Sequence, residues 1–158
     1  MIVLVRAVTY AALFVGFVLV FLPARVLTAS GVAPPAAIEM PQAAGMLMVA
    51  IGAALALWCV LAFSFVGKGT PAPFDPPRRL VVSGPYRVVR NPMYIGAALA
   101  LAGAALFYQS GPLLGYAALF VLAAHLFVVG YEEPALRQAF GGEYEAYCRR
   151  VGRWWPIR

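Results

Sequence analysis

The sequence contains little charge. Only 11% of its 158 residues are charged and 63% are hydrophobic, whereas a soluble domain is about a quarter charged and about half apolar. A chain of this composition cannot cover a compact surface with polar groups, so lipid must form part of its surroundings. The length fits a single domain, and we expect residues 1–158 to form one membrane domain.

Histidine and cysteine are also scarce. His125 is the only histidine, and Cys59 and Cys148 are the only cysteines. One histidine excludes a site built from several histidines, and we expect no metal ion. Two cysteines this far apart do not indicate a disulfide framework. The sequence has neither a phosphate-binding loop nor a nucleophile-elbow motif, so it lacks the marks of two common enzyme classes.

Acidic residues are outnumbered by basic ones, which gives a net charge of +6. The basic residues gather in two segments, Gly67–Met93 and the tail after Tyr131, whereas the loop between the first two apolar stretches has only Arg25, set against Glu39. The positive-inside rule therefore places both basic segments and the N-terminus in the cytoplasm, in what we expect to be a bacterial inner membrane. These charges flank apolar stretches and are not part of a motif that contacts the grooves of DNA or RNA, so we expect no nucleic-acid partner.

Four apolar stretches predict transmembrane helices. They are Ile2–Leu22, Ala43–Val66, Tyr94–Gln109 and Leu113–Tyr131. A spanning helix needs about 20 apolar residues, so the third stretch is short and the other three are long enough. A cleaved signal peptide is the alternative for the first stretch, but no small-x-small cleavage site follows it closely. Ser110-Gly111-Pro112 predicts a tight hairpin between the third and fourth helices.

The tail after the fourth stretch predicts an amphipathic helix. Pro134 should break or re-aim the chain, and an apolar side follows, made of Leu136, Phe140, Tyr144, Tyr147, Cys148 and Val151. Such a helix lies in the membrane interface or folds back over the bundle. Trp154-Trp155 is typical of an interfacial anchor. We therefore predict an all-α integral membrane protein with four transmembrane helices and a C-terminal amphipathic helix.

Two segments carry residues that packing alone does not explain. One is residues 84–96, and the other runs from His125 to Glu133, where His125 and Glu132 share a helix face. Two adjacent carboxylates at a helix C-terminus repel each other and oppose the helix dipole. They therefore need a cation, and the hairpin should bring Arg87 or Arg90 near them. A structural salt bridge is one explanation, and a site for a cationic or zwitterionic ligand is the other.

S-adenosylmethionine has the charges that such a site would bind. Its ammonium needs a carboxylate, and its carboxylate can pair with an arginine through two hydrogen bonds. Its sulfonium is already electrophilic, so the protein has mainly to align the methyl donor with the acceptor and exclude water.

The two segments resemble one family of membrane enzymes. The strings GPYRVVRNPMYIG (residues 84–96) and YEEPALRQAFGGEYEAYCRRV (residues 131–151), with His125 between them, resemble the isoprenylcysteine carboxyl methyltransferase and phospholipid N-methyltransferase superfamily. The resemblance covers Pro85 to Pro156. It implies a methyltransferase that uses S-adenosylmethionine, with a cytoplasmic cofactor pocket formed by the last helices and the tail. Residues 1–66 would then be an N-terminal helix pair and residues 67–158 the catalytic region.

The resemblance also implies roles for individual residues. Arg90 would position the substrate or cofactor carboxylate, and Glu132 or Glu133 would hold the cofactor ammonium. We assign Arg90 and Glu133 to catalysis, and cofactor binding to Arg87, Asn91, Pro92, Tyr94, Gly96, His125, Glu132, Tyr144, Tyr147 and Arg150. The sequence departs from the family pattern at Asn91, where the prenylcysteine enzymes have histidine, and at Gly152, where many relatives have proline. The first departure weakens the case for a prenylated protein substrate, and the second leaves the path of the tail open.

The methyl acceptor is expected to be a lipophilic or small molecule that presents a carboxylate, an amine or a thiol. A carboxylate needs no general base, whereas an amine or thiol would need Glu133 or His125 in that role. Two other functions remain possible from the sequence. One is a non-catalytic bundle that binds anionic lipid or a partner protein. The other is a reductase with a nicotinamide cofactor, although membrane sterol reductases are much longer. The sequence does not indicate an oligomeric state.

Overall fold

The computed structural model describes residues 9, 12, 13, 15–62, 65, 66 and 79–157, which are helical with connecting turns and contain no strand. The elements are η1 (Val15–Phe21), α2 (Leu22–Ala29), α3 (Met40–Ala62), η3 (Gly84–Arg87), α4 (Pro92–Phe107), α5 (Gly111–Phe127), η4 (Val128–Glu132) and α6 (Glu133–Arg150). This confirms the predicted all-α class for the described chain. The start of the first apolar stretch, with Arg6, lies outside it, as do Lys68 and Arg78.

Among the residues that the structure describes, two helices are long and apolar enough to cross a membrane. They are α3 and the continuous helical segment Gly111–Arg150, while Gly16–Ala29 and Pro92–Phe107 are apolar but shorter. The 16 residues of α4 span about 24 Å at 1.5 Å per residue, which is less than the roughly 30 Å of a hydrocarbon core. Four transmembrane crossings therefore stay a prediction.

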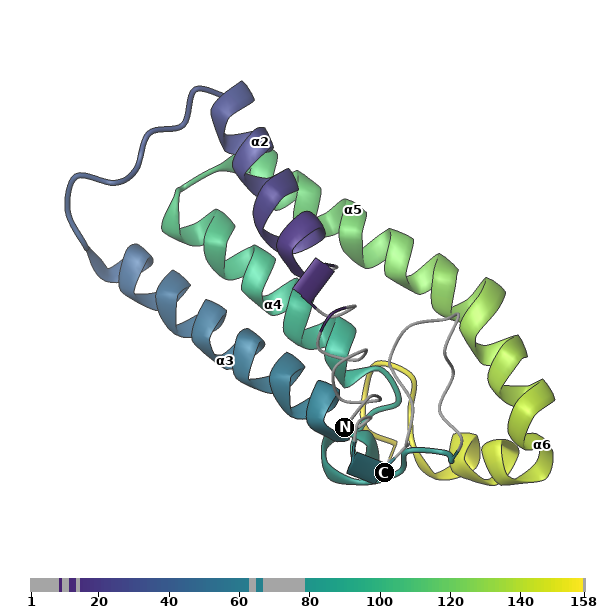
Figure 1. The fold of residues 1–158 in the computed structure, drawn as a ribbon. Coiled ribbons are helices and arrows are strands. Elements are labelled where there is room, and N and C mark those ends of the chain that lie inside the picture. Colours follow the sequence, from purple (N-terminus) through teal and green to yellow (C-terminus); the bar gives the residue numbers. More distant parts are fainter. Residues whose placement is uncertain (1–8, 10–11, 14, 63–64, 67–78, 158) are drawn as a thin grey trace.

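The first apolar stretch ends later than the sequence analysis predicted. We placed its end at Leu22, but α2 continues the helix to Ala29. Pro23 does not stop the helix because the π-helical segment η1 comes directly before α2, and such a wide turn accommodates a residue without a backbone N–H. In Figure 1 α2 lies alongside α5.

Helices α3 and α4 pack with their backbones in contact. A Cβ atom added at Gly96 would lie 2.7 Å from the carbonyl oxygen of Gly52, and one added at Gly103 would lie 2.7 Å from that of Gly45. These distances admit only glycine, as expected for helices that associate through small residues in lipid. The contact fixes α4 against α3, and thereby fixes the residues at the start of α4.

The predicted hairpin between the third and fourth apolar stretches is confirmed. The hydroxyl of Ser110 accepts a hydrogen bond of 3.2 Å from the backbone N–H of Leu113 and so caps α5. Gln109 makes the turn with a φ of +50°. In Figure 1 α4 and α5 lie side by side, so the start of α4 and the end of α5 are at the same end of the molecule.

The predicted break at Pro134 is wrong. The backbone stays helical from α5 through the π-helical turn η4 into α6, and the non-helical residue is Gly141, with φ 49° and ψ −123°. The wide turn just before Pro134 lets the helix tolerate a residue without an N–H. Figure 1 shows α5 running into α6 in nearly one direction before the chain turns back toward the other helices.

The predicted apolar side of the C-terminal helix is confirmed. Tyr144, Tyr147 and Val151 form a buried cluster, against which Leu80 packs from the connector that precedes α4. Leu136, Phe140 and Cys148 complete this cluster. The C-terminal helix therefore folds back over the start of α4 instead of extending away from the bundle.

Candidate active site

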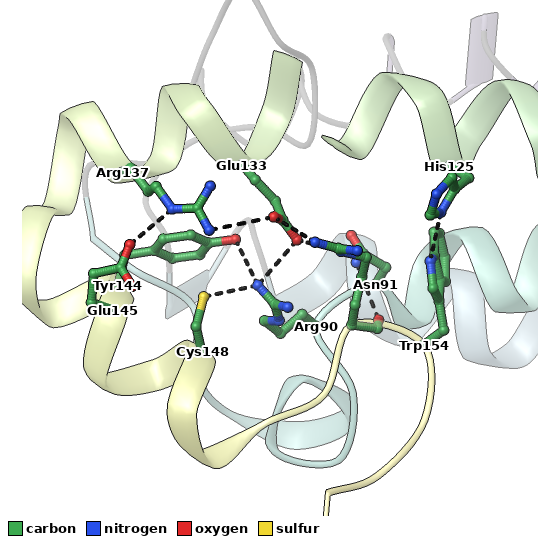
Figure 2. Close-up of polar contacts among 10 residues, drawn as sticks. Arg90, Asn91, His125, Glu133, Arg137, Tyr144, Glu145, Cys148 and Trp154 are labelled. Atoms are coloured by element: carbon green, nitrogen blue, oxygen red, sulfur yellow. Dashed lines mark hydrogen bonds and ion pairs between the residues drawn. The ribbon is translucent and has the colours of Figure 1, made fainter. Parts of the chain in front are cut away.

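The centre of the site is the buried carboxylate of Glu133, which is 3% exposed. Arg153 donates to both of its oxygens, from Nε to Oε1 at 2.6 Å and from Nη2 to Oε2 at 2.9 Å. Nη1 of Arg90 lies 3.1 Å from Oε1, and Nη2 of Arg137 lies 3.7 Å from Oε2. Figure 2 shows the guanidinium groups of Arg90 and Arg137 directed at this carboxylate, so that with Arg153 three of these groups surround it. They supply the positive charge that a buried carboxylate requires.

Arg90 connects this carboxylate to the C-terminal helix. Its Nη1 also donates to the hydroxyl of Tyr144 at 3.3 Å and to the sulfur of Cys148 at 2.8 Å. The Nε of Arg90 is buried and has no hydrogen-bond partner within the described chain. A buried N–H without an acceptor costs free energy. A ligand that accepts a hydrogen bond there would remove this cost. We expected Arg87 or Arg90 to lie near the two glutamates, and Arg90 does so through its ion pair with Glu133.

Glu132 has different surroundings from its neighbour. It is half-buried, and its Oε2 accepts a hydrogen bond of 3.2 Å from the hydroxyl of Tyr94. Across the residues that the structure describes, no arginine or lysine lies within ion-pair distance of Glu132. Consecutive side chains leave a helix in different directions, so the guanidinium groups that pair with Glu133 do not pair with Glu132. Glu132 therefore keeps the capacity to bind a cation.

Tyr94, which hydrogen-bonds to Glu132, belongs to a group of three aromatic rings with Trp154 and His125. The indole N–H of Trp154 donates to Nδ1 of His125 at 3.1 Å, as Figure 2 shows. The rings of Tyr94 and Trp154 meet edge to face with centroids 6.5 Å apart, and those of His125 and Trp154 are 6.1 Å apart. The faces of such rings attract cations. The site thus combines an unpaired carboxylate with an aromatic wall.

The C-terminal segment after α6 closes the site from one side. The backbone N–H of Arg90 donates to the carbonyl of Gly152 at 2.8 Å, and the side-chain amide of Asn91 donates to the carbonyl of Arg153 at 3.2 Å. A Cβ atom at Gly152 would collide with the carbonyl oxygen of Trp155. The path of the tail, which the sequence left open at Gly152, therefore depends on glycine. The hydrogen bond to Glu133 raises the pKa of Arg153 further above its usual value, so Arg153 stays charged.

Other predicted site residues serve mainly as framework. Tyr147 is buried and donates to the backbone carbonyl of Tyr86 at 2.7 Å, and Pro92 is a buried residue in the first turn of α4. Gly96 makes the close approach to α3. These residues hold the start of α4 against the C-terminal helix and α3, while their contact with a cofactor stays a prediction.

Two predicted arginines are not brought into this cluster. Arg87 is exposed, and Arg150 is exposed with its Nε donating to the carbonyl of Ala146 in its own helix at 3.2 Å. Neither lies within ion-pair distance of a carboxylate of the described chain.

Sequence reasoning missed four residues of the site, which are Arg137, Cys148, Arg153 and Trp154. Arg137 had a local signal, because it lies four residues after Glu133 and such pairs face each other on a helix. Arg153 and Trp154 had none, since they reach the site through a tail that folds back. The two tryptophans of the predicted membrane anchor therefore differ. Trp155 is 82% exposed and stays a candidate anchor, whereas Trp154 belongs to the site.

The α3–α4 pair also has a groove, at the far end of α4 from this cluster. It has a volume of about 430 Å³ and is lined by Met46, Val49, Ala50, Ala104, Phe107 and Tyr108. No charged residue of the described chain lines it, so these residues do not supply the groups that a charged cofactor needs.

Comparison with known proteins agrees with the class that the fold and the site indicate, a helical membrane enzyme. The chain matches the phospholipid methyltransferase family over residues 40–143. It therefore belongs to this family of membrane methyltransferases, and this membership gives no support to the reductase alternative. A search of solved structures found no significant match.

A curated relative is the cobalt-zinc-cadmium resistance protein CzcN of Cupriavidus metallidurans. The two sequences are 30% identical over 112 residues, which cover 71% of this chain and 47% of CzcN. The chain thus spans about half the length of this relative.

Proposed function

We propose that this protein transfers the methyl group of S-adenosylmethionine to a lipophilic or small acceptor that reaches the site from the bilayer. Family membership supplies the reaction class. The observation that carries the proposal is the half-buried carboxylate of Glu132, which Tyr94 orients and which no arginine or lysine of the described chain neutralises. A carboxylate in this position favours a ligand with positive charge, and the cofactor is a cation at its sulfonium and at its ammonium.

The residues present fit this cofactor. Glu132 would accept hydrogen bonds from the ammonium, and the unpartnered Nε of Arg90 would donate to the carboxylate. Tyr94 and Trp154 would flank the positive charge with their rings. When bound, the cofactor supplies a methyl group that is already electrophilic. The chain's own task is then to hold donor and acceptor in line and to keep water out.

We assign Glu133 a positioning role in place of the catalytic role that the sequence suggested. Its two oxygens form ion pairs with Arg90, Arg137 and Arg153, so the carboxylate is poorly placed to take a proton from a substrate. His125 is also engaged, because its Nδ1 already accepts the indole N–H of Trp154. We therefore expect an acceptor that needs no general base at the site, which is a carboxylate, or an amine or thiol that arrives already deprotonated.

The proposed enzyme is oriented with this site at the cytoplasmic side of four transmembrane helices. The support is the distribution of basic residues, since the polar cluster uses the same two basic segments that the positive-inside rule places in the cytoplasm. An acceptor dissolved in the bilayer would reach the site from the lipid side.

The test is transfer of a labelled methyl group. Membranes containing the full chain, supplied with S-adenosylmethionine labelled in the methyl group, should incorporate label into extracted lipids or small thiols, amines or acids. Glu132→Gln should lower this incorporation roughly ten- to hundredfold, the usual worth of a hydrogen bond to a charged group. Glu143→Gln, an exposed glutamate of α6, is the matched control and should behave as wild type. Equal incorporation by the two variants would remove the proposed role of Glu132.

A further inference from the structure

A surface next to the site combines exposed arginines with exposed apolar side chains. The backbones of residues 89 and 152 form a parallel bridge, and Ile157 and Trp155 lie against Gly152. The exposed residues around this bridge are Arg87, Val88, Arg149, Arg150, Trp155 and Ile157. We call this set the basic-apolar patch.

The arginines of the patch differ from those of the site. Arg90 and Arg153 are neutralised by the buried carboxylate of Glu133, whereas the three patch arginines have no carboxylate within ion-pair distance in the described parts of the chain. The patch therefore carries a net charge of about +3 and would attract an anionic surface. Two of these arginines, Arg87 and Arg150, are the ones that the sequence assigned to the cofactor and that the structure leaves outside the site.

The apolar members of the patch narrow the choice of partner. Trp155 is 82% exposed, and Val88 and Ile157 are each 55% exposed. Side chains of this kind gain nothing from a free anion in water, but they are favoured where headgroups meet hydrocarbon, and tryptophan is enriched there. All six patch residues also come from the two basic segments, Gly67–Met93 and the tail after Tyr131, which the positive-inside rule places at the cytoplasmic face of the membrane.

We propose that the basic-apolar patch binds anionic phospholipid headgroups at the cytoplasmic leaflet. The guanidinium groups contact the headgroup phosphates, and Trp155 with its apolar neighbours enters the interface. The site behind the patch is then held at the membrane surface. This binding does not depend on methyl transfer and holds for a protein of this fold with any acceptor.

The experiment compares lipid binding by the purified full chain and two triple variants. Arg87→Gln/Arg149→Gln/Arg150→Gln removes the charge, and Arg87→Lys/Arg149→Lys/Arg150→Lys retains it as the matched control. Phosphatidylglycerol or phosphatidylcholine is titrated into each protein in detergent, and native mass spectrometry counts the bound lipids. Thermal unfolding without added lipid establishes that each variant is folded.

We expect the glutamine variant to bind phosphatidylglycerol at least about tenfold more weakly than wild type, because each basic residue near an anionic surface contributes severalfold. The lysine variant should stay within about threefold of wild type, and phosphatidylcholine should bind all three proteins equally. Unchanged binding by the glutamine variant would overturn the proposal, as would an equal loss in the lysine variant. Displacement of the lipid by inorganic phosphate at the same concentration would also overturn it, because the patch would then be a site for a free anion.

Discussion

At the scale of single residues, two adjacent glutamates have opposite situations. Glu133 is buried and forms ion pairs with three guanidinium groups. Glu132 is half-buried and accepts one hydrogen bond from a tyrosine hydroxyl. The helix causes this difference, because consecutive side chains leave it in different directions. One glutamate is therefore neutralised by arginines of the chain itself, and the other is the residue for which we propose a ligand. The sequence indicated the pair and led us to assign Glu133 to catalysis and Glu132 to the cofactor, whereas the contacts of Glu133 favour a positioning role for it.

The structural role of Glu133 predicts a loss of stability in Glu133→Gln. The change leaves Arg90, which is 12% exposed, without its counter-ion, and breaking a buried pair from one side costs about 3 kcal/mol or more. For a chain of this size that corresponds to a decrease in Tm of roughly 6–12 °C.

The control is Glu145→Gln, which breaks the ion pair between Arg137 and Glu145, whose side chains are 48% and 47% exposed. Exposed pairs contribute little to stability because water screens them, so the Tm of this variant should stay close to that of wild type. Thermal unfolding in one detergent measures both variants. Similar Tm values for the two would show that Glu133 does not hold the site together.

Residue-level prediction succeeded where the signal was local. Arg90 was expected near the glutamates because a hairpin of known direction returns the fourth helix beside the third, and the apolar side of α6 followed from helical spacing. Arg153 and Trp154 were missed because their positions depend on a tail that turns back after Gly152. No periodicity of the sequence encodes such a turn, because it depends on the close approach of the backbone of Trp155 to Gly152 in the folded chain.

At the scale of elements, the start of α4 supports the site. Its backbone is held against α3 by the glycine contacts and against the tail by the hydrogen bonds of Arg90 and Asn91. The sequence indicated the small residues and the hairpin, so the pairing of these helices was predictable. The continuous helix through Pro134 was not predictable. The π-helical turn just before this proline lowers the cost of placing proline inside a helix, and it leaves no mark in the apolar pattern of the sequence.

The glycine contacts predict that Gly103→Ala lowers stability. The new methyl group would lie 2.7 Å from the carbonyl oxygen of Gly45 and 2.8 Å from the Cβ of Met48, so α3 and α4 must separate, at a cost of about 1–3 kcal/mol. Gly115→Ala in α5 is the control, since a Cβ atom there meets nothing within 4 Å and alanine favours the helix by up to about 1 kcal/mol. Unfolding measurements should give a lower Tm for the first variant and an equal or higher Tm for the second. A Tm of Gly103→Ala at or above that of Gly115→Ala would contradict the close packing of α3 on α4.

At the scale of the whole molecule, polar chemistry is concentrated at one end of an apolar bundle. The start of α4, the end of α5, α6 and the tail meet there. The arginines of the cluster come from the two basic segments of the sequence. The low charge of the sequence predicted a membrane protein, and its uneven distribution predicted which end carries the site. The composition could not indicate that the tail forms one wall of that site.

The measurement that tests the central claim most directly is binding of S-adenosylhomocysteine to the purified full chain by isothermal titration calorimetry. This product keeps the ammonium and the carboxylate of the cofactor and cannot react. We predict that wild type and Glu143→Gln bind it with the same affinity, and that Glu132→Gln binds it roughly tenfold or more weakly, because one hydrogen bond to a charged group is lost. Equal binding by Glu132→Gln and wild type, or no binding by folded wild-type protein, would contradict a cofactor site at Glu132.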